Sequence, residues 1–307
     1  MPILVAGGTG FIGRHLVRRL VEAGAEVTVY TRDRERGRRR LGPGVGLCDT
    51  LEGVAAATPR AVVNLAGEGI ADWPWTVARR RALVASRVGF TQALCATLAA
   101  APPEVMINAS AIGFYGVDPE RTFTEEDGPG SGFSAALCER WEATARESAP
   151  EGCRVVCLRI GLVLGPGGML ERMRGPFSLG LGGRIGDGKQ WMSWVHLEDV
   201  LGLIERALVD DAFEGPVNAT APEPITNIEF TRTLGRVLKR PTFFPVPALL
   251  LRTLLGDMAE EILLAGPRVR PARAQQAGYQ FQHLVLEDAI RDALGKEPAQ
   301  PGQAEEE

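Results

Sequence analysis

The sequence lacks the segments that would place the protein in a membrane or outside the cell. It has no uninterrupted apolar run of about eighteen residues, which a membrane-spanning helix needs. Its first residues pass straight into a short apolar run and glycines, without the basic region and long apolar stretch of a signal peptide. The five cysteines are an odd number, and none forms a C-x-x-C pair. We therefore expect a cytoplasmic protein with reduced thiols, no membrane contact and no metal site.

An excess of positive charge is also missing. The chain has 34 Lys and Arg against 38 Asp and Glu, which gives a net charge of -4. Nucleic acid is therefore not an expected partner, because binding its phosphates needs a net basic face. Arginines do cluster between residues 34 and 40, and we interpret most of that run as a solvated loop.

What is present is the composition of a globular protein, with 45% hydrophobic and 23% charged residues. Buried strands are expected at residues 2–6, 26–31, 61–65, 105–109 and 154–160. Helical patterns lie between them, at residues 11–23, 79–100 and 134–148. This alternation predicts an α/β fold built on a doubly wound, parallel Rossmann sheet.

The pattern changes in the second half of the chain. Residues 165–188 are dense in glycine, which predicts a long loop or lid around a short helix. Thr226 and Glu229 have the spacing of a helix capping box. We expect a Rossmann domain made of residues 1–165 and 195–217. Residues 166–194 and 218–294 would form a smaller, mostly helical substrate-facing lobe, followed by a disordered tail at 295–307.

A glycine triplet follows the first expected strand and opens the first expected helix. Its spacing is G-x-x-G-x-x-G, as a tight turn, a close approach to a pyrophosphate and close helix–strand packing require. The strand–turn–helix context favours a dinucleotide site over a plain glycine-rich turn. The residues expected to contact the cofactor here are Gly7, Thr9, Gly10, Phe11, Ile12 and Gly13.

The end of the second strand should show which dinucleotide binds. An Asp or Glu at this point favours NAD, whereas an Arg accommodates the 2′-phosphate of NADP. The sequence places Thr31 and Arg32 here, and the Arg32 guanidinium is suited to a phosphate. Asp33 follows directly, so a register error of one residue would reverse the preference. We predict NADP(H) as the cofactor.

Small residues close the strand that begins at residue 61. Asn64 is followed by Leu65, Ala66 and Gly67, which would let the backbone pass beside the adenosine and its ribose. The alternative is a strand end with an ordinary turn.

Several ordered segments resemble the extended short-chain dehydrogenase/reductase superfamily. Within it the chain is similar to the NAD-dependent epimerase/dehydratase-like proteins of the YfcH type and to the vertebrate family 39U member. The resemblance covers almost the whole chain and is carried by residues 7–13, 64–67, 86–87, 158–165, 176–183, 194–200, 218–227 and 278–281. It implies that the neighbours of NADP(H) include Thr31, Arg32, Leu65, Ala66, Arg87 and Leu162.

The resemblance also exposes a missing catalytic pair. Most members of the superfamily use a Ser with a Tyr and a Lys spaced Y-x-x-x-K, where the Lys lowers the tyrosine pKa. Ser110 occupies the serine region here. Aligning Glu142 with the glutamate that usually follows the lysine places Ser134 at the tyrosine and Cys138 at the lysine. Neither replacement supplies the same acid or the same cation.

Only three tyrosines are available as substitutes, and Tyr115 is the nearest to Ser110. It lies on the loop beyond a strand's carboxyl end, where ligands of open α/β sheets bind. Tyr115 is therefore a candidate proton donor, with a structural packing role as the favoured alternative. Ser110 and Tyr115 are the two candidates for catalysis.

Two functions follow from these observations. The first is an NADP(H)-dependent oxidoreductase or epimerase-like enzyme that acts on an unidentified small molecule. The second is a catalytically silent NADP(H)-binding protein that reports cofactor state to a partner, which the loss of the Tyr–Lys pair favours. The sequence names no substrate and leaves a homodimer open.

Overall fold

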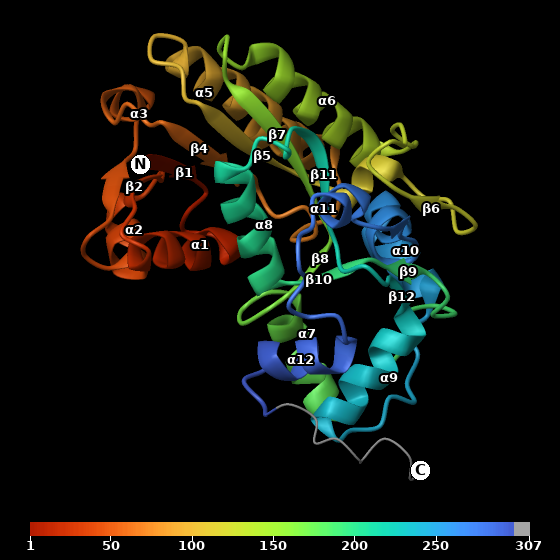
Figure 1. The fold of residues 1–307 in the computed structure, drawn as a ribbon. Helices are drawn as coiled ribbons and strands as arrows, with labels where there is room; N and C mark the ends of the chain where they lie inside the picture. Colours follow the sequence, from red (N-terminus) through yellow and green to blue (C-terminus); the bar gives the residue numbers. More distant parts are fainter. Residues whose placement is uncertain (298–307) are drawn as a thin grey trace.

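The computed structural model describes residues 1–297 of the chain (Figure 1). Its centre is a seven-stranded sheet in the order β11-β7-β5-β4-β1-β2-β3. All neighbouring strands in this sheet are parallel. The strands are β1 (Pro2–Ala6), β2 (Glu26–Tyr30), β3 (Gly46–Cys48), β4 (Ala61–Asn64), β5 (Val105–Ala111), β7 (Arg154–Ile160) and β11 (Gly215–Ala219). This order confirms the predicted doubly wound Rossmann sheet.

Helices cover both faces of the sheet. One layer holds α1 (Phe11–Glu22) packed against α2 (Arg34–Leu41) and α8 (Leu197–Val209). The other layer holds α3 (Leu51–Ala56), α5 (Phe90–Leu98) and α6 (Phe133–Ser148). α4 (Val77–Val84) runs through a π-helical turn, η1 (Ala85–Gly89), into α5. Because both faces are covered, the central strands are almost wholly apolar and buried.

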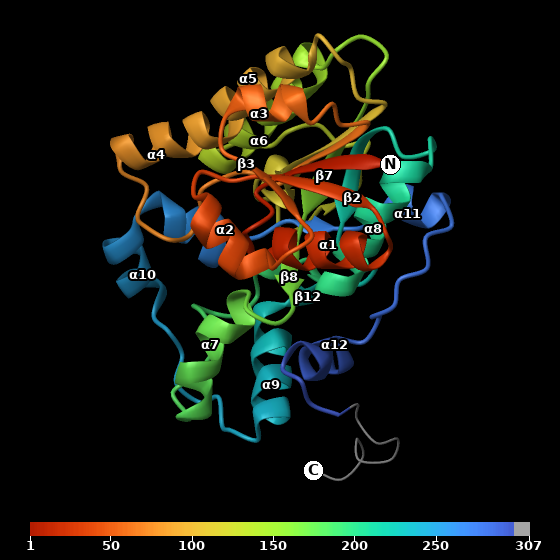
Figure 2. The ribbon, with the colours of Figure 1, turned by 90° about the vertical axis from the view of Figure 1, so that its left-hand side faces the viewer.

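A smaller lobe is built from the glycine-rich region and the C-terminal segment. Its core packs α7 (Met169–Ser178), α9 (Asn227–Leu238) and α12 (Leu286–Ala293) around the buried Trp194 and Phe230. The C-terminal segment also forms α10 (Ala248–Leu255) and η3 (Ala259–Leu263), which contribute to an apolar core shared with α6. It also forms α11 (Ala272–Gln276), which packs against β11 of the central sheet. Figure 2 shows α7, α9 and α12 on the side of the sheet away from α5. The capping box at the start of α9 is confirmed, with both of its bonds formed.

Short strands join the two parts. β8 (Leu162–Leu164) pairs with β10 (Trp194–His196), and β9 (Trp191–Met192) pairs with β12 (Ile225–Thr226). β6 (Thr122–Phe123) pairs with β13 (Arg268–Val269), and η2 (Ile112–Tyr115) follows β5. β8 and β10 therefore form a two-stranded sheet that is separate from the central sheet. Within residues 1–297, no helix is long and apolar enough to cross a bilayer.

Two expectations from the sequence are wrong in detail. The arginine run at 34–40 is the helix α2 and not a solvated loop, because the Asp33 carboxylate caps its N-terminus and the basic last turn suits the helix dipole. The disordered tail was predicted to begin at residue 295, which is too early. The Gly295 and Lys296 N–H groups still donate to carbonyl oxygens at the end of α12. The rest of that prediction, residues 298–307, lies outside the described residues.

Candidate functional site

The glycine loop turns sharply between β1 and α1. Gly7 has a φ of +78°, and a Cβ added there would lie 2.5 Å from the Leu65 carbonyl oxygen. A Cβ on Gly13 would lie 2.3 Å from the Gly7 carbonyl oxygen. The Gly10 N–H donates to that same oxygen at 2.9 Å. Side chains at these positions would fill the turn, so the glycines leave the backbone open to a ligand.

The start of α1 provides an electropositive end beside this turn. Its N-cap is Gly10, and no side chain makes a capping hydrogen bond there within the described residues. The first N–H groups of the helix are therefore open to a phosphate. Thr9, Phe11 and Ile12 are half-buried around the loop, as expected for residues that border a cofactor.

Just beyond the end of β2, the Asp33 carboxylate already has a hydrogen-bond partner. The Asp33 Oδ1 accepts the Arg36 N–H at 2.9 Å and caps α2. The Thr31 hydroxyl donates to the Asp33 carbonyl oxygen at 3.2 Å, which fixes the turn. Arg32 is exposed and forms no ion pair within residues 1–297. Asp33 thus caps α2, and the Arg32 side chain is left exposed beside it.

The loop after β4 lies directly beside the glycine turn. The Asn64 amide donates to the Thr91 hydroxyl at 2.9 Å and to Asn108 Oδ1 at 2.7 Å. Its own oxygen accepts the Ala66 N–H at 3.2 Å. These bonds hold Leu65, Ala66 and the following glycine against the glycine loop, at the point where the strand order reverses. Ligands of open α/β sheets bind in this crevice.

Arg87 brings a partly buried cation to the same crevice. A Cβ on Gly67 would lie 3.1 Å from the Arg87 Cζ, so the guanidinium packs on that glycine. It donates to the Glu68 carbonyl oxygen at 2.9 Å and lies over the Trp141 ring at 5.3 Å. Burial lowers the pKa of Arg87. Arg87 lies in the π-helical turn η1, a kind of bulge that often marks functional sites.

Leu162 lies on β8, just beyond the carboxyl end of β7. Its N–H donates to the Ser193 carbonyl oxygen at 2.9 Å, and its side chain is half-buried. The glycine before it also needs the close approach, because a Cβ on Gly161 would lie 2.3 Å from that oxygen. Apart from Arg87 in η1, the predicted cofactor residues therefore lie just beyond the carboxyl ends of β1, β2, β4 and β7.

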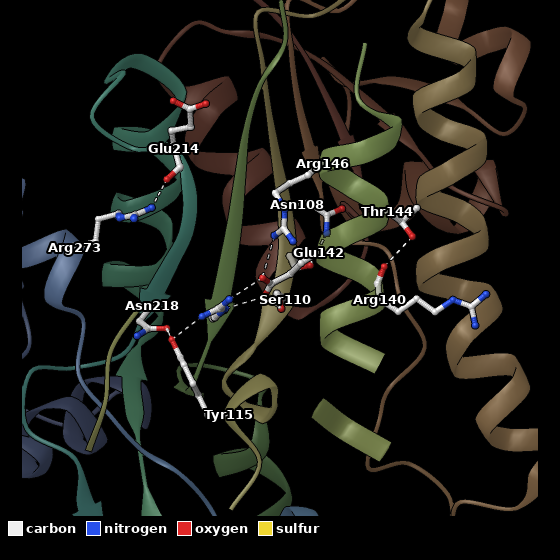
Figure 3. A network of polar contacts seen from close by, with 12 residues as sticks. Asn108, Ser110, Tyr115, Arg140, Glu142, Thr144, Arg146, Glu214, Asn218 and Arg273 are labelled. Atoms are coloured by element: carbon white, nitrogen blue, oxygen red, sulfur yellow. Dashed lines mark hydrogen bonds and ion pairs between the residues drawn. The ribbon is translucent and has the colours of Figure 1, made fainter. Parts of the chain in front are cut away.

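Ser110 and Tyr115 belong to one buried polar network (Figure 3). The Ser110 hydroxyl donates to Glu142 Oε1 at 2.7 Å. Arg159 donates to both Glu142 oxygens, at 2.8 and 2.9 Å, and to the Tyr115 hydroxyl at 2.9 Å. The Tyr115 hydroxyl in turn donates to Asn218 Oδ1 at 2.7 Å. All polar partners are satisfied, which stabilises the interior behind the crevice.

This network limits what the two hydroxyl groups can do. Tyr115 is 1% exposed and Ser110 is 4% exposed. Burial raises the pKa of Tyr115 to about 12, in spite of the Arg159 cation beside it. A tyrosine in this state remains protonated and serves as a hydrogen-bond donor. Its catalytic role stays a prediction, and so does that of Ser110.

The helix that should carry the missing pair has buried replacements. The Ser134 hydroxyl is buried and has no hydrogen-bond partner within the described residues. Burial raises the pKa of Cys138 to about 11, so the thiol is neutral. The Glu261 carboxylate caps this helix by accepting the Phe133 and Ser134 N–H groups at 2.9 and 2.8 Å. Neither position thus holds a cation or an acid that ionises near neutral pH.

Three potential metal ligands meet away from the crevice: His196, His283 and Asp292. No spacing in the sequence groups them, because His196 lies far along the chain from the other two. The His196 Nδ1 accepts the Glu198 N–H at 3.3 Å, so its hydrogen lies on Nε2, which faces Asp292 Oδ2 at 3.1 Å. The centres of the two imidazole rings lie 3.7 Å apart, with the rings tilted by 37°.

Glu142, Arg159 and Asn218 are the important residues that sequence reasoning missed. Arg159 is 3% exposed and Glu142 and Asn218 are wholly buried. The available signal was an arginine inside an apolar strand, because a buried charge requires a partner. Its partner lies on α6 and cannot be identified from spacing.

Family models and relatives agree with this architecture. Residues 3–218 match the model of the NAD dependent epimerase/dehydratase family. The chain belongs to this family. Residues 246–293 match a domain of unknown function, DUF1731, which covers part of the smaller lobe. The predicted resemblance to the extended dehydrogenase/reductase superfamily is thus confirmed.

Relatives match over nearly their whole length. The epimerase family protein Mb2239 of Mycobacterium bovis is 41% identical, over 98% of both chains. The human epimerase family protein SDR39U1 is 36% identical, over 96% of this chain and all of the human one. A chloroplastic homologue from Arabidopsis thaliana is 37% identical, over 95% of this chain and 86% of its own. A crystal structure of human SDR39U1 with NADPH superposes with a TM-score of 0.86 at 34% identity, covering 96% and 99% of the two chains.

Proposed function

We propose that this protein binds NADP(H) in the crevice between the carboxyl ends of β1 and β4. The observation that carries the proposal is the glycine turn between β1 and α1, where any side chain at Gly7 or Gly13 would collide with backbone atoms. The open start of α1 would receive the pyrophosphate, and Arg87 would add a cation on the other wall. The NADPH bound by human SDR39U1 supports the choice of dinucleotide.

The preference for the phosphorylated cofactor rests on the end of β2. Asp33 is turned away to cap α2, so no carboxylate from this position repels a 2′-phosphate. Arg32 and Thr31 are the residues that would bind it. We expect NADPH to bind more tightly than NADH for this reason.

We further propose an oxidoreductase or epimerase-like reaction on a small molecule. NADPH, when bound, supplies a hydride. Ser110 would orient the substrate oxygen after the loss of its bond to Glu142, and the proton would come from water or Tyr115. The geometry favours water, because Tyr115 is 1% exposed and burial raises its pKa to about 12.

A second candidate function is a silent NADP(H)-binding protein that signals cofactor state. The buried Ser134 and Cys138 favour it, because neither supplies the acid or the cation of the usual pair. The buried hydrogen bond from the Ser110 hydroxyl to Glu142 also favours the silent function.

Turnover distinguishes the two functions. The full-length protein is incubated with NADPH and a panel of carbonyl compounds, and substrate-dependent oxidation of NADPH is followed by absorbance. It is also incubated with NADP⁺ and a panel of sugar nucleotides, and epimerised product, which forms without net change in the cofactor, is followed by chromatography. An enzyme gives turnover that falls at least tenfold in Ser110→Ala and is unchanged in Ser148→Ala, a serine at the end of α6. NADPH binding without turnover, together with NADPH-dependent capture of a protein partner, supports the silent function.

The setting of the protein is also a proposal. We propose that it works in the cytoplasm with reduced thiols, which agrees with five free cysteines, four of them buried. A homodimer stays a prediction from the sequence.

A further inference from the structure

Helix α2 concentrates positive charge next to the crevice. Residues 32–40 contain six arginines and two carboxylates in a chain whose net charge is -4. Most arginines elsewhere pair with a carboxylate, as Arg19 does with Glu198 and Glu205. None of these six forms an ion pair within residues 1–297. This row of cations without ion-pair partners gives the edge of the site a local positive potential that attracts an anion.

One of the six points back to the glycine loop. The Arg40 Nη1 donates to the Thr9 carbonyl oxygen at 2.9 Å. Gly37 lies one turn earlier on the same face of α2, and a Cβ there would lie 3.1 Å from the Thr31 methyl group. Arg40 is therefore held between the two segments that border the predicted adenosine ribose, the glycine loop and the end of β2.

The Arg40 guanidinium has donors to spare and room to move. The bond to Thr9 uses one of its five N–H groups, and no other bond from this side chain exists within the described residues. Arg40 also borders a cavity of about 390 Å³ between α1 and the segment after α2. The carboxylate lining that cavity belongs to Glu22, which is already paired with Arg18 at 2.8 Å.

We propose that Arg40 is a second residue of the 2′-phosphate subsite, which closes on the phosphate from the side opposite Arg32. This inference rests on the proposed NADP(H) binding. It assigns part of the preference for NADP(H) over NAD(H) to a residue on α2, beyond the end of β2. Two guanidinium groups around one phosphate provide charge-assisted, bidentate hydrogen bonds that NAD(H) cannot use. The Thr9 carbonyl holds Arg40 in place before the cofactor arrives, which lowers the entropic cost of binding.

The test compares Arg40→Ala with Arg39→Ala in the full-length protein. Arg39 is exposed on the same helix and makes no side-chain hydrogen bond within residues 1–297, so its variant controls for the loss of one positive charge. Affinities for NADPH and NADH are measured by calorimetry at fixed salt. We expect Arg40→Ala to weaken NADPH binding about tenfold, the effect of one charge-assisted hydrogen bond. NADH binding should change less than about twofold, and Arg39→Ala should change neither by more than that.

The outcomes separate this inference from the proposed function. Equal losses of NADPH affinity in both variants would mean that only the general field of α2 matters, and would overturn the inference. Unchanged NADPH binding in Arg40→Ala, with a loss in Arg32→Ala, would overturn it while the proposed function stands. If the wild-type protein binds neither dinucleotide, the proposed function itself fails. Unaltered circular dichroism of each variant confirms that α2 is still folded.

Discussion

At the scale of single residues, the interior behind the crevice depends on one buried ion pair. Arg159 reaches from β7 to Glu142 on α6 and to the Tyr115 hydroxyl, and its guanidinium also lies 3.5 Å from the centre of the Phe114 ring. Both charges are removed from water, so each depends on the other. The contacts that Ser110 and Tyr115 make here are therefore those of a structural network.

Removing one charge of this pair should be costly. In Glu142→Gln the Arg159 cation stays buried without its counterion, and we expect a loss of about 3 kcal/mol in the free energy of unfolding. Glu139→Gln, at an exposed position on the same helix, should change it by less than about 0.5 kcal/mol. Denaturant titration of both variants measures the difference. Similar, small losses in the two variants would show that the network contributes little to stability.

A second residue-scale prediction concerns pH. Burial and the neighbouring His283 lower the pKa of His196 to about 4, although the Asp292 carboxylate opposes this shift. The unfolded chain binds a proton at this residue more readily, near the usual pKa of 6.5. The stability that comes from neutral His196 is therefore complete above pH 6.5 and is lost as the pH falls toward 4.

The variant His196→Asn isolates this effect, because an asparagine oxygen can still cap α8. Between pH 7 and pH 4.5 the wild-type protein should lose about 2 kcal/mol of unfolding free energy relative to the variant. Chemical denaturation at both pH values gives the two differences. Parallel pH profiles for the two proteins would contradict a buried, neutral His196.

At the scale of elements, the turn from β1 to α1 contributes both to the stability of the fold and to the binding of NADPH. A methyl group at Gly13 would meet the Gly7 carbonyl oxygen at 2.3 Å and the Gly8 Cα at 2.7 Å. We expect Gly13→Ala to lose about 2 kcal/mol of stability and to bind NADPH at least tenfold more weakly. Gly175→Ala, inside α7 with no atom within 4 Å, should keep both. Thermal melting and NADPH titration test the pair, and normal NADPH binding by Gly13→Ala would contradict the assigned cofactor position.

The elements were predictable where their patterns are local. β1 and β7 were predicted with correct bounds, because an uninterrupted buried run identifies a central parallel strand. Helix α2 was missed, because its residues carry almost no apolar face. It forms through the Asp33 cap and the packing of Gly37 on Thr31, and the latter contact is between separate elements. β3, with three residues, is too short to stand out in a sequence.

The site was predictable to a similar degree. The glycine spacing and the neighbourhood of Arg32 follow from one segment each, so the sequence shows them. The capping role of Asp33 and the contact of Arg40 with Thr9 depend on how segments meet in space. The same holds for the ion pair of Arg159, whose partner lies on another element.

At the scale of the whole molecule, two lobes meet along the carboxyl ends of the central strands. The smaller lobe is connected through short strand pairs and through Glu261, which caps α6 of the Rossmann domain. Glu261 thereby ties the C-terminal segment to the start of α6. Domain pairs of this kind place a substrate between a bound cofactor and a second lobe.

The central claim is that this frame binds NADP(H) through an arginine that no carboxylate neutralises. Calorimetric titration of the full-length protein with NADPH and with NADH, repeated with Arg32→Ala, tests it most directly. The account predicts that NADPH binds at least tenfold more tightly than NADH, and that Arg32→Ala removes most of this difference while leaving NADH binding unchanged. Equal binding of the two dinucleotides, or no binding of either, would contradict it.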